Sequence, residues 1–219
     1  VACCYNPDMT ESSGSRRDPS ATPHKSQAIE MTSLSNHFLI AMPNMRDPSF
    51  VRSVAFMCQH NAEGSMGIIV NRLSEYRLGD VLAQMGLKSE LAEVEDAPVL
   101  IGGPVQPERG FVLHMPHGTW ESSYQVSETL CVTTSRDVLV AIAEGRGPDR
   151  ALVALGYAGW GAGQIEIELK ENSWLTTHSS DTSMFETPRE QRLEAAAALG
   201  GASIANTPGD ARRCVRDGP

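Results

Sequence analysis

Residues 151–164 read ALVALGYAGWGAGQ, and the rest of the chain is best understood outward from this stretch. The apolar run 151–157 predicts a buried strand. In Gly159-Trp160-Gly161, small residues allow another backbone to approach closely around one large ring, and Gln164 stands where a helix with free N–H groups can begin. Two interpretations stay open: a ligand lies against Trp160, or Trp160 anchors a close strand and helix contact. The glycine spacing is not that of the dinucleotide-binding fingerprint.

Outward from this stretch, short apolar segments bounded by Gly, Pro and Asn predict a sheet-dominated core. With 151–157 they make seven strands, the other six being 38–41, 53–58, 67–70, 99–101, 111–114 and 130–133.

Three helices are also expected. Leu78, Val81, Leu82 and Met85 recur at helical spacing, so 78–85 predicts an amphipathic helix whose apolar stripe faces the sheet. Residues 134–137 resemble a capping box, with Asp in place of Glu, and predict a second helix that ends at Gly145. Residues 164–170 fit either a strand or a helix, because their apolar residues alternate and also recur one helical turn apart.

The ends of the chain differ from its middle. Residues 1–33 are rich in Ser, Thr, Pro and charge, and we expect a disordered extension there. We expect a domain over 34–187, then a C-terminal helix and a flexible tail over 188–219. The chain shows no signal-peptide core, no membrane-length apolar run and no disulfide framework among its five cysteines, so we expect a cytoplasmic protein that does not contact membranes.

The charge of the middle region argues against nucleic acid as a partner. Residues 34–186 hold 10 Lys and Arg against 19 Asp and Glu, which equals the net charge of −9 of the whole chain. An acidic domain repels phosphate backbones, and no helix-turn-helix pattern stands out. We therefore expect no direct binding to DNA or RNA.

Several blocks, taken in order, resemble one known family. They are 38–43 (FLIAMP), 64–72 (GSMGIIVNR), 102–105 (GGPV), 109–114 (RGFVLH), 155–166 (LGYAGWGAGQIE) and 172–175 (NSWL). Together they are similar to the bacterial YqgE/AlgH family, over roughly residues 34–185. The resemblance implies an α+β fold, with a bent, bifurcated mixed sheet that closes toward a pseudo-barrel and helices packed outside, and it favours a helix at 164–170. It implies no activity, although members are often labelled transcriptional regulators.

Candidate ligand-binding residues come from the glycine-rich bends and the polar groups beside them. Gly102 and Gly103 stand before Pro104 and either free the backbone to approach a ligand or simply form a turn. The two guanidinium groups of Arg72 and Arg109 would suit a carboxylate or phosphate. We expect one surface cleft formed by Gly102, Gly103, Gly159, Trp160 and Gly161, with Asn71 or Arg109 at its edge, and Arg72 completes the set of eight candidate ligand-binding residues. Each of them also has an ordinary structural interpretation as a turn, packing or salt-bridge residue.

Other motifs point to chemistry less strongly. Cys58-x-His60 and His114-x-x-His117 have zinc-ligand residue types, but they lie in different segments and partly in apolar strands. We expect no metal, no cofactor and no catalytic residue. The sequence favours a regulatory or binding protein for an unknown small molecule or protein, acting on gene expression indirectly; the alternative is a hydrolase or transferase that uses the same cleft.

Overall fold

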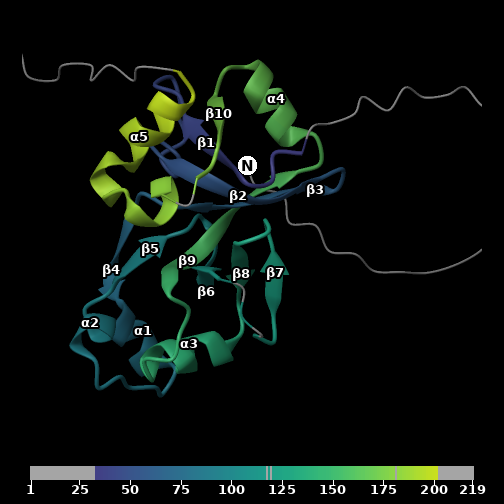
Figure 1. Cartoon of the computed structure of the whole chain (residues 1–219). Coiled ribbons are helices and arrows are strands. Elements are labelled where there is room, and N and C mark those ends of the chain that lie inside the picture. Colours follow the sequence, from purple (N-terminus) through teal and green to yellow (C-terminus); the bar gives the residue numbers. More distant parts are fainter. Residues whose placement is uncertain (1–32, 117, 119, 181, 202–219) are drawn as a thin grey trace, which may run out of the picture. The chain divides into compact units, whose positions relative to one another are not determined.

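The computed structural model describes residues 33–116, 118, 120–180 and 182–201, which form an α+β domain (Figure 1). Its strands follow the order β10-β1-β2-β3-β9-β6-β8-β7, and β4 and β5 join the sheet through β9. The strands are β1 (His37–Ala41), β2 (Val54–Asn61), β3 (Gly64–Ile69), β4 (Leu73–Arg77), β5 (Pro98–Ile101), β6 (Val105–Met115), β7 (Ser123–Gln125), β8 (Cys131–Thr133), β9 (Arg150–Gly161) and β10 (Trp174–His178). The helices are α1 (Leu78–Gln84), α2 (Ala92–Glu95), α3 (Arg136–Ala143), α4 (Gln164–Lys170), the π-helix η1 (Thr182–Glu186), the 3-10 helix η2 (Arg189–Gln191) and α5 (Arg192–Leu199).

The sheet divides along the long strand β9. The C-terminal part of β9 pairs with β3, and its N-terminal part lies between β6, which is antiparallel to it, and β5, which is parallel. In Figure 1, β1, β2, β3 and β10 lie in the upper part of the view, and the other strands lie on either side of β9 in the lower part. The resulting sheet is strongly curled, mixed and bifurcated, which confirms the predicted α+β architecture.

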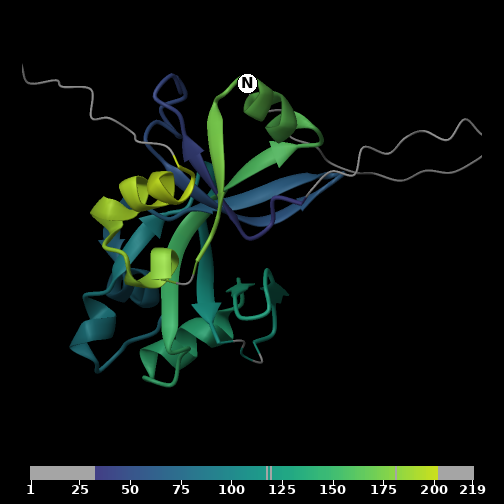
Figure 2. The same cartoon turned by 45° about the horizontal axis from the view of Figure 1, so that its top comes forward.

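Both faces of the sheet are covered, so alternate residues of one strand enter different cores. Phe38 and Ile40 point into the interior of the curled sheet, which η1 and α5 close through Met184 and Leu193. The intervening Leu39 faces a second core under α4. The turned view in Figure 2 shows α5, in yellow, beside the upper part of the sheet. Burial on both faces explains the unbroken apolar runs that made these strands predictable.

A third core lies under α1 and α3, on the outer face of the lower strands. Leu78 and Leu82 of α1 and Val138 of α3 pack there against Val112 of β6 and Val153 of β9. A pocket opens at the edge of this core.

The seven predicted strands are all present, with ends that differ by up to six residues, the largest difference being at the start of β6. The helices predicted at 78–85 and 164–170 correspond to α1 and α4. The helix predicted from 134–137 to Gly145 corresponds to α3, but the predicted capping box is wrong, because Ser135 is the N-cap residue and its side chain makes no cap hydrogen bond. The helix does stop before Gly145, which has a φ of +70°.

The expected tails fall largely outside the described residues, which exclude 1–32 and 202–219. Within the expected C-terminal segment, η2 and α5 are described, and α5 packs onto the domain. Leu193, Ala196 and Ala197 of α5 are buried in the same core as β1 and β2. Helix α5 therefore contributes to the packing of the domain.

Candidate ligand-binding site

Gly102 and Gly103 pack against the backbone of β9, where no side chain would fit. A Cβ atom on Gly102 would lie 2.2 Å from the carbonyl oxygen of Gly156, and one on Gly103 would lie 2.2 Å from the carbonyl group of Tyr157. The Gly102 N–H also donates to the Leu155 carbonyl at 2.7 Å. The glycine turn thus brings the end of β5 into backbone contact with β9.

Trp160 is an anchor in the core under α4. Its ring is 5% exposed, stacks on Phe50 with centroids 6.0 Å apart and meets Trp174 edge to face. The Glu168 carboxylate of α4 accepts from both indoles through Oε2, at 3.1 Å from Trp160 Nε1 and 2.7 Å from Trp174 Nε1. The two indole N–H groups are thereby satisfied inside the core.

Gly159 and Gly161 flank Trp160 on β9 and are exposed. They pair with Met66 and Gly64 of β3, and the Gly161 N–H donates to Gln164 Oε1 at 3.0 Å. These glycines lie in the end of β9 that leads into α4.

Asn71 and Arg72 hold the loop before β2. Asn71 accepts from the Val54 N–H at 2.8 Å and donates to the Arg52 carbonyl at 2.9 Å. The Arg72 guanidinium donates to three carbonyl groups of that loop, those of Pro48, Ser49 and Val51. Both side chains are engaged with backbone of the same loop.

Arg109 lies elsewhere, on β6. Its guanidinium donates to Gln106 Oε1 and Thr134 Oγ1, both at 3.3 Å, and its Cζ lies 5.6 Å from the centroid of the Phe111 ring. None of the eight residues in the predicted set lines the pocket between β6, α1 and α3 or the smaller one beside Trp120. A shared ligand cleft for this set stays a prediction, while each of its members has a defined structural contact.

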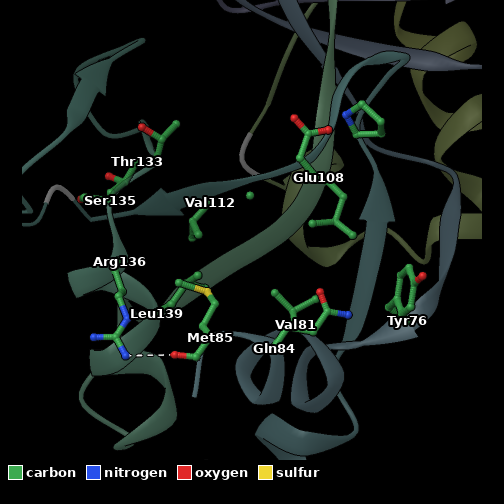
Figure 3. Close-up of a pocket in the computed structure, with 14 residues that line it drawn as sticks. Tyr76, Val81, Gln84, Met85, Glu108, Val112, Thr133, Ser135, Arg136 and Leu139 are labelled. Atoms are coloured by element: carbon green, nitrogen blue, oxygen red, sulfur yellow. Dashed lines mark hydrogen bonds between the residues drawn. The ribbon is translucent and has the colours of Figure 1, made fainter. Parts of the chain in front are cut away.

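A pocket of about 570 Å³ opens instead between β6, α1 and α3 (Figure 3). Its volume lies within the range that small-ligand sites usually have. Apolar side chains form part of its lining, namely Val81, Met85, Val112, Leu139 and Leu155. Polar side chains make up most of the remainder, namely Tyr76, Gln84, Glu108, Thr133, Thr134, Ser135 and Arg136.

One wall of the pocket is a bulge in β6. Val105 pairs with Tyr157 and Gly110 with Leu155, so residues 106–109 stand opposite the single residue Gly156 of β9. Gly156 has a φ of +72°, and Gln106 has a φ of +49°, which is unusual for a residue with a side chain. Such a conformation costs roughly 1–2 kcal/mol. The bulge removes Glu108 from the regular strand and places it at the pocket.

The charged groups of the pocket come from two different elements and do not pair with each other. Arg136, at the start of α3, donates to the Met85 carbonyl of the opposite helix at 3.1 Å. Among the described residues, the exposed Glu108 carboxylate has neither a hydrogen bond nor an ion pair. Figure 3 shows Glu108 and Arg136 on opposite sides of Val112 and Leu139.

Asp137, the residue after Arg136 on α3, adds a fixed negative charge next to the pocket lining. Burial by itself raises its pKa, but hydrogen bonds from the Ser135 hydroxyl at 2.5 Å and from the backbone N–H groups of Glu121 and Val138 outweigh burial and lower the pKa below its ordinary value. Asp137 is therefore ionised at neutral pH and is already supplied with donors.

A buried chain of hydroxyl and imidazole groups lies behind the pocket. The Thr133 hydroxyl is 2.8 Å from His114 Nε2 and 2.6 Å from Ser123 Oγ, and His114 Nδ1 is 3.2 Å from the Pro116 carbonyl. Because a carbonyl only accepts, His114 carries its proton on Nδ1 and Thr133 donates to Nε2. Thr133 and His114 are both 0% exposed, so the pair is closed to solvent although Thr133 belongs to the pocket lining.

His60 forms a second buried polar contact, under α4. Its Nδ1 accepts from the Leu34 N–H at 2.9 Å, so its Nε2 carries the proton and donates to Glu166 Oε1 at 2.9 Å. Burial raises the pKa of Glu166, but the hydrogen bond from His60 and further favourable interactions outweigh it and lower the pKa. Both ring nitrogens of His60 are engaged, which leaves no free nitrogen for a general base.

The described residues contain no cluster of His, Cys, Asp and Glu arranged to hold a metal ion. Cys58 is buried, and burial raises its pKa well above the ordinary range; burial also raises the pKa of Cys131. Such thiols are poor nucleophiles at neutral pH. No helix in the described part of the chain is long and apolar enough to cross a membrane.

Comparisons with known proteins agree with these observations. A family model described as AlgH-like matches residues 38–205. A UPF0301 protein from Methylococcus capsulatus is 54% identical over 171 residues, which cover 78% of this chain and 91% of the relative. A UPF0301 protein from Xanthomonas campestris is 55% identical over 166 residues, which cover 76% of this chain and 88% of the relative.

Solved structures support the same assignment. The solution structure of the AlgH protein from Pseudomonas aeruginosa has a TM-score of 0.70 and 45% identity, over 80% of this chain and 92% of that chain. Protein DIP2367 from Corynebacterium diphtheriae, with a TM-score of 0.57 and 16% identity over 72% of this chain and 82% of that chain, shares the fold alone. The sequence blocks, the curled sheet divided along β9 and these matches together show that the chain belongs to the AlgH-like family, also designated UPF0301.

Proposed function

We propose that this protein is a binding protein that takes a small amphipathic ligand in the pocket between β6, α1 and α3. The observation that carries this proposal is the bulge of residues 106–109, which departs from the regular strand, holds Gln106 at positive φ and forms a wall of a 570 Å³ pocket. Backbone strain of this kind clusters at functional sites, where the surrounding structure maintains it.

The lining supports binding more than catalysis. Apolar residues of the third core supply contact area, while hydroxyl, amide and charged groups at the rim can fix the orientation of a ligand. Catalysis by general acid and base needs titratable groups within reach of the substrate. In the described residues, the hydroxyl and imidazole pair nearest to the pocket is completely buried, and Glu108 has no partner to activate it. A hydrolase or transferase is therefore the weaker alternative.

As part of the same proposal, any effect on gene expression passes through the bound ligand or a protein partner and not through DNA. The net charge of −9 supports this, because phosphate contacts depend on clustered positive charge.

A fragment screen tests the proposed function, with binding followed by thermal shift and by amide chemical shifts. Two glycines provide a matched pair of blocking variants. Gly110 lines the pocket, and a Cβ atom there meets nothing within 4 Å; Gly161 lies on β9 outside the pocket, with its nearest contact at 3.8 Å. We expect Gly110→Leu to abolish the stabilisation by fragment hits and Gly161→Leu to preserve it.

The reverse result would move the site to the glycine-rich segment around Trp160, as the sequence alone suggested. A library of several hundred fragments without one specific hit on the wild-type protein would refute the proposed function.

A further inference from the structure

The pocket holds two opposite charges that have no ionic partner in it. Glu108 and Arg136 stand on different elements and form no ion pair with each other, and the guanidinium uses one N–H on the Met85 carbonyl. The four remaining N–H groups of Arg136 are available to an acceptor. Among the residues that the structure describes, neither charge takes part in an ion pair.

Glu108 and Arg136 are both exposed, so their charges matter for a ligand that lies against them. Covering an ionised group without supplying a partner costs its hydration, and this cost exceeds what a covered apolar atom returns. An apolar molecule would leave both groups without a partner, and an ion of a single sign would satisfy one of them. A molecule with a cationic group at one end and an anionic group at the other satisfies both.

The residues between the two charges define the middle of such a ligand. Figure 3 places Val112, Leu139 and Met85 between Glu108 and Arg136, so the ligand is apolar between its ends. In a free amino acid both charges are attached to one Cα atom, with no apolar segment between them. A chain of three residues spans about 10 Å when extended and carries its charges at its two ends.

We infer that the pocket binds short apolar peptides with both termini free, with the amino group at Glu108 and the carboxylate at Arg136. This inference rests on the proposed function, since it names the ligand class of the same pocket. The Thr134 hydroxyl lies on the same wall as Arg136 and accepts from Arg109, so its own proton can be donated to the carboxylate end.

The test uses three probes and three variants of the full chain. The probes are the tripeptide Ala-Leu-Ala, its N-acetylated form and its C-terminal amide, and affinity is measured by isothermal titration calorimetry. For the wild-type protein we expect each capped probe to bind about tenfold more weakly than the free peptide, as a charged hydrogen bond in a partly exposed site implies.

The variants assign each end to one residue. For Glu108→Gln, acetylation of the peptide should change its affinity less than about twofold, while amidation should still weaken binding. For Arg136→Gln, amidation of the peptide should have the small effect and acetylation should still weaken binding. Arg136→Lys keeps the charge and should keep most of the amidation effect. Melting temperatures confirm that each variant is folded, and Glu108, which has no partner, should not contribute to stability.

The outcomes separate the inference from the proposed function. Equal affinity for capped and free peptides, or a capping effect that persists in both matching variants, would overturn the peptide assignment. If fragments bind at the pocket but no tripeptide does, the ligand class is wrong and the proposed function stands. If neither binds, both are wrong.

Discussion

The Glu168 carboxylate should be a major source of stability for the core under α4, and the substitution Glu168→Leu tests this. One oxygen of the carboxylate accepts from two indole N–H groups, at 3.1 and 2.7 Å, and the other accepts from Gln164 Nε2 at 2.8 Å. The rings of Trp160 and Trp174 are only 5% and 4% exposed. Leucine would fill a similar volume but would leave both indole donors without an acceptor.

The magnitude follows from the cost of buried donors without partners. Each costs about 1–3 kcal/mol, so the loss of two donors would cost about 2–6 kcal/mol if water stayed out. Because Glu168 is itself partly exposed, water can replace part of the interaction, and we expect a loss of about 2–4 kcal/mol in the free energy of unfolding. Glu168→Gln keeps a neutral acceptor and should lose about 1 kcal/mol.

Urea denaturation followed by far-UV circular dichroism measures these losses, and tryptophan emission reports on the same rings. The matched control is Glu171→Leu, which makes the same chemical change at an exposed residue directly after α4. If Glu168→Leu destabilised the protein no more than Glu171→Leu, the carboxylate would not be holding the two indoles together.

Two further predictions concern the glycine turn and the loss of stability at acidic pH. Gly103→Ala places a Cβ atom 2.2 Å from the Tyr157 backbone and should lower the free energy of unfolding, measured by urea denaturation, by about 3 kcal/mol or more. In the control Gly161→Ala the nearest contact is at 3.8 Å, and the loss should be under about 1 kcal/mol. Equal losses would contradict the close contact of β5 and β9. The lowered pKa of Glu166 means that its contribution to stability is present above its ordinary pKa of 4.5 and is lost as the pH falls through the lower folded-state pKa. Urea midpoints from pH 7 to pH 2 should therefore fall less for Glu166→Gln than for the wild-type protein, and identical profiles would show that the His60 contact contributes nothing.

The predictable part of the fold is the part that is buried on both faces. Strands such as β2 and β9 read as continuous apolar runs because alternate residues enter different cores. The prediction misses β4, β7 and β10. All three lie at edges of the sheet, and nearly all residues of β4 and β7 are exposed. Such strands carry no periodic apolar pattern, and only pairing with a neighbour defines them.

The pocket was not predictable for a related reason. Its lining comes from β4, β6, β8, β9, α1 and α3, and no single segment contains a pattern that announces it. Residues 134–137 were interpreted as a capping box, whereas Ser135 and Arg136 face the pocket. The one local sign of the pocket is the polar stretch 106–109 inside an otherwise strand-like segment. In the sequence, such a stretch looks the same as an ordinary turn.

The glycine blocks and the pocket are nevertheless linked through the backbone. Gly102 and Gly103 bring β5 against β9 without side chains between them, and the next residues then start β6 at Val105, opposite Tyr157. Since β6 regains its regular pairing only at Gly110, the four intervening residues have to leave the sheet, and they do so toward α1 and α3. A larger residue in the glycine turn would shift this starting point and with it the position of Glu108. The glycines that the sequence suggested as ligand contacts thus act on the pocket by fixing where its wall begins.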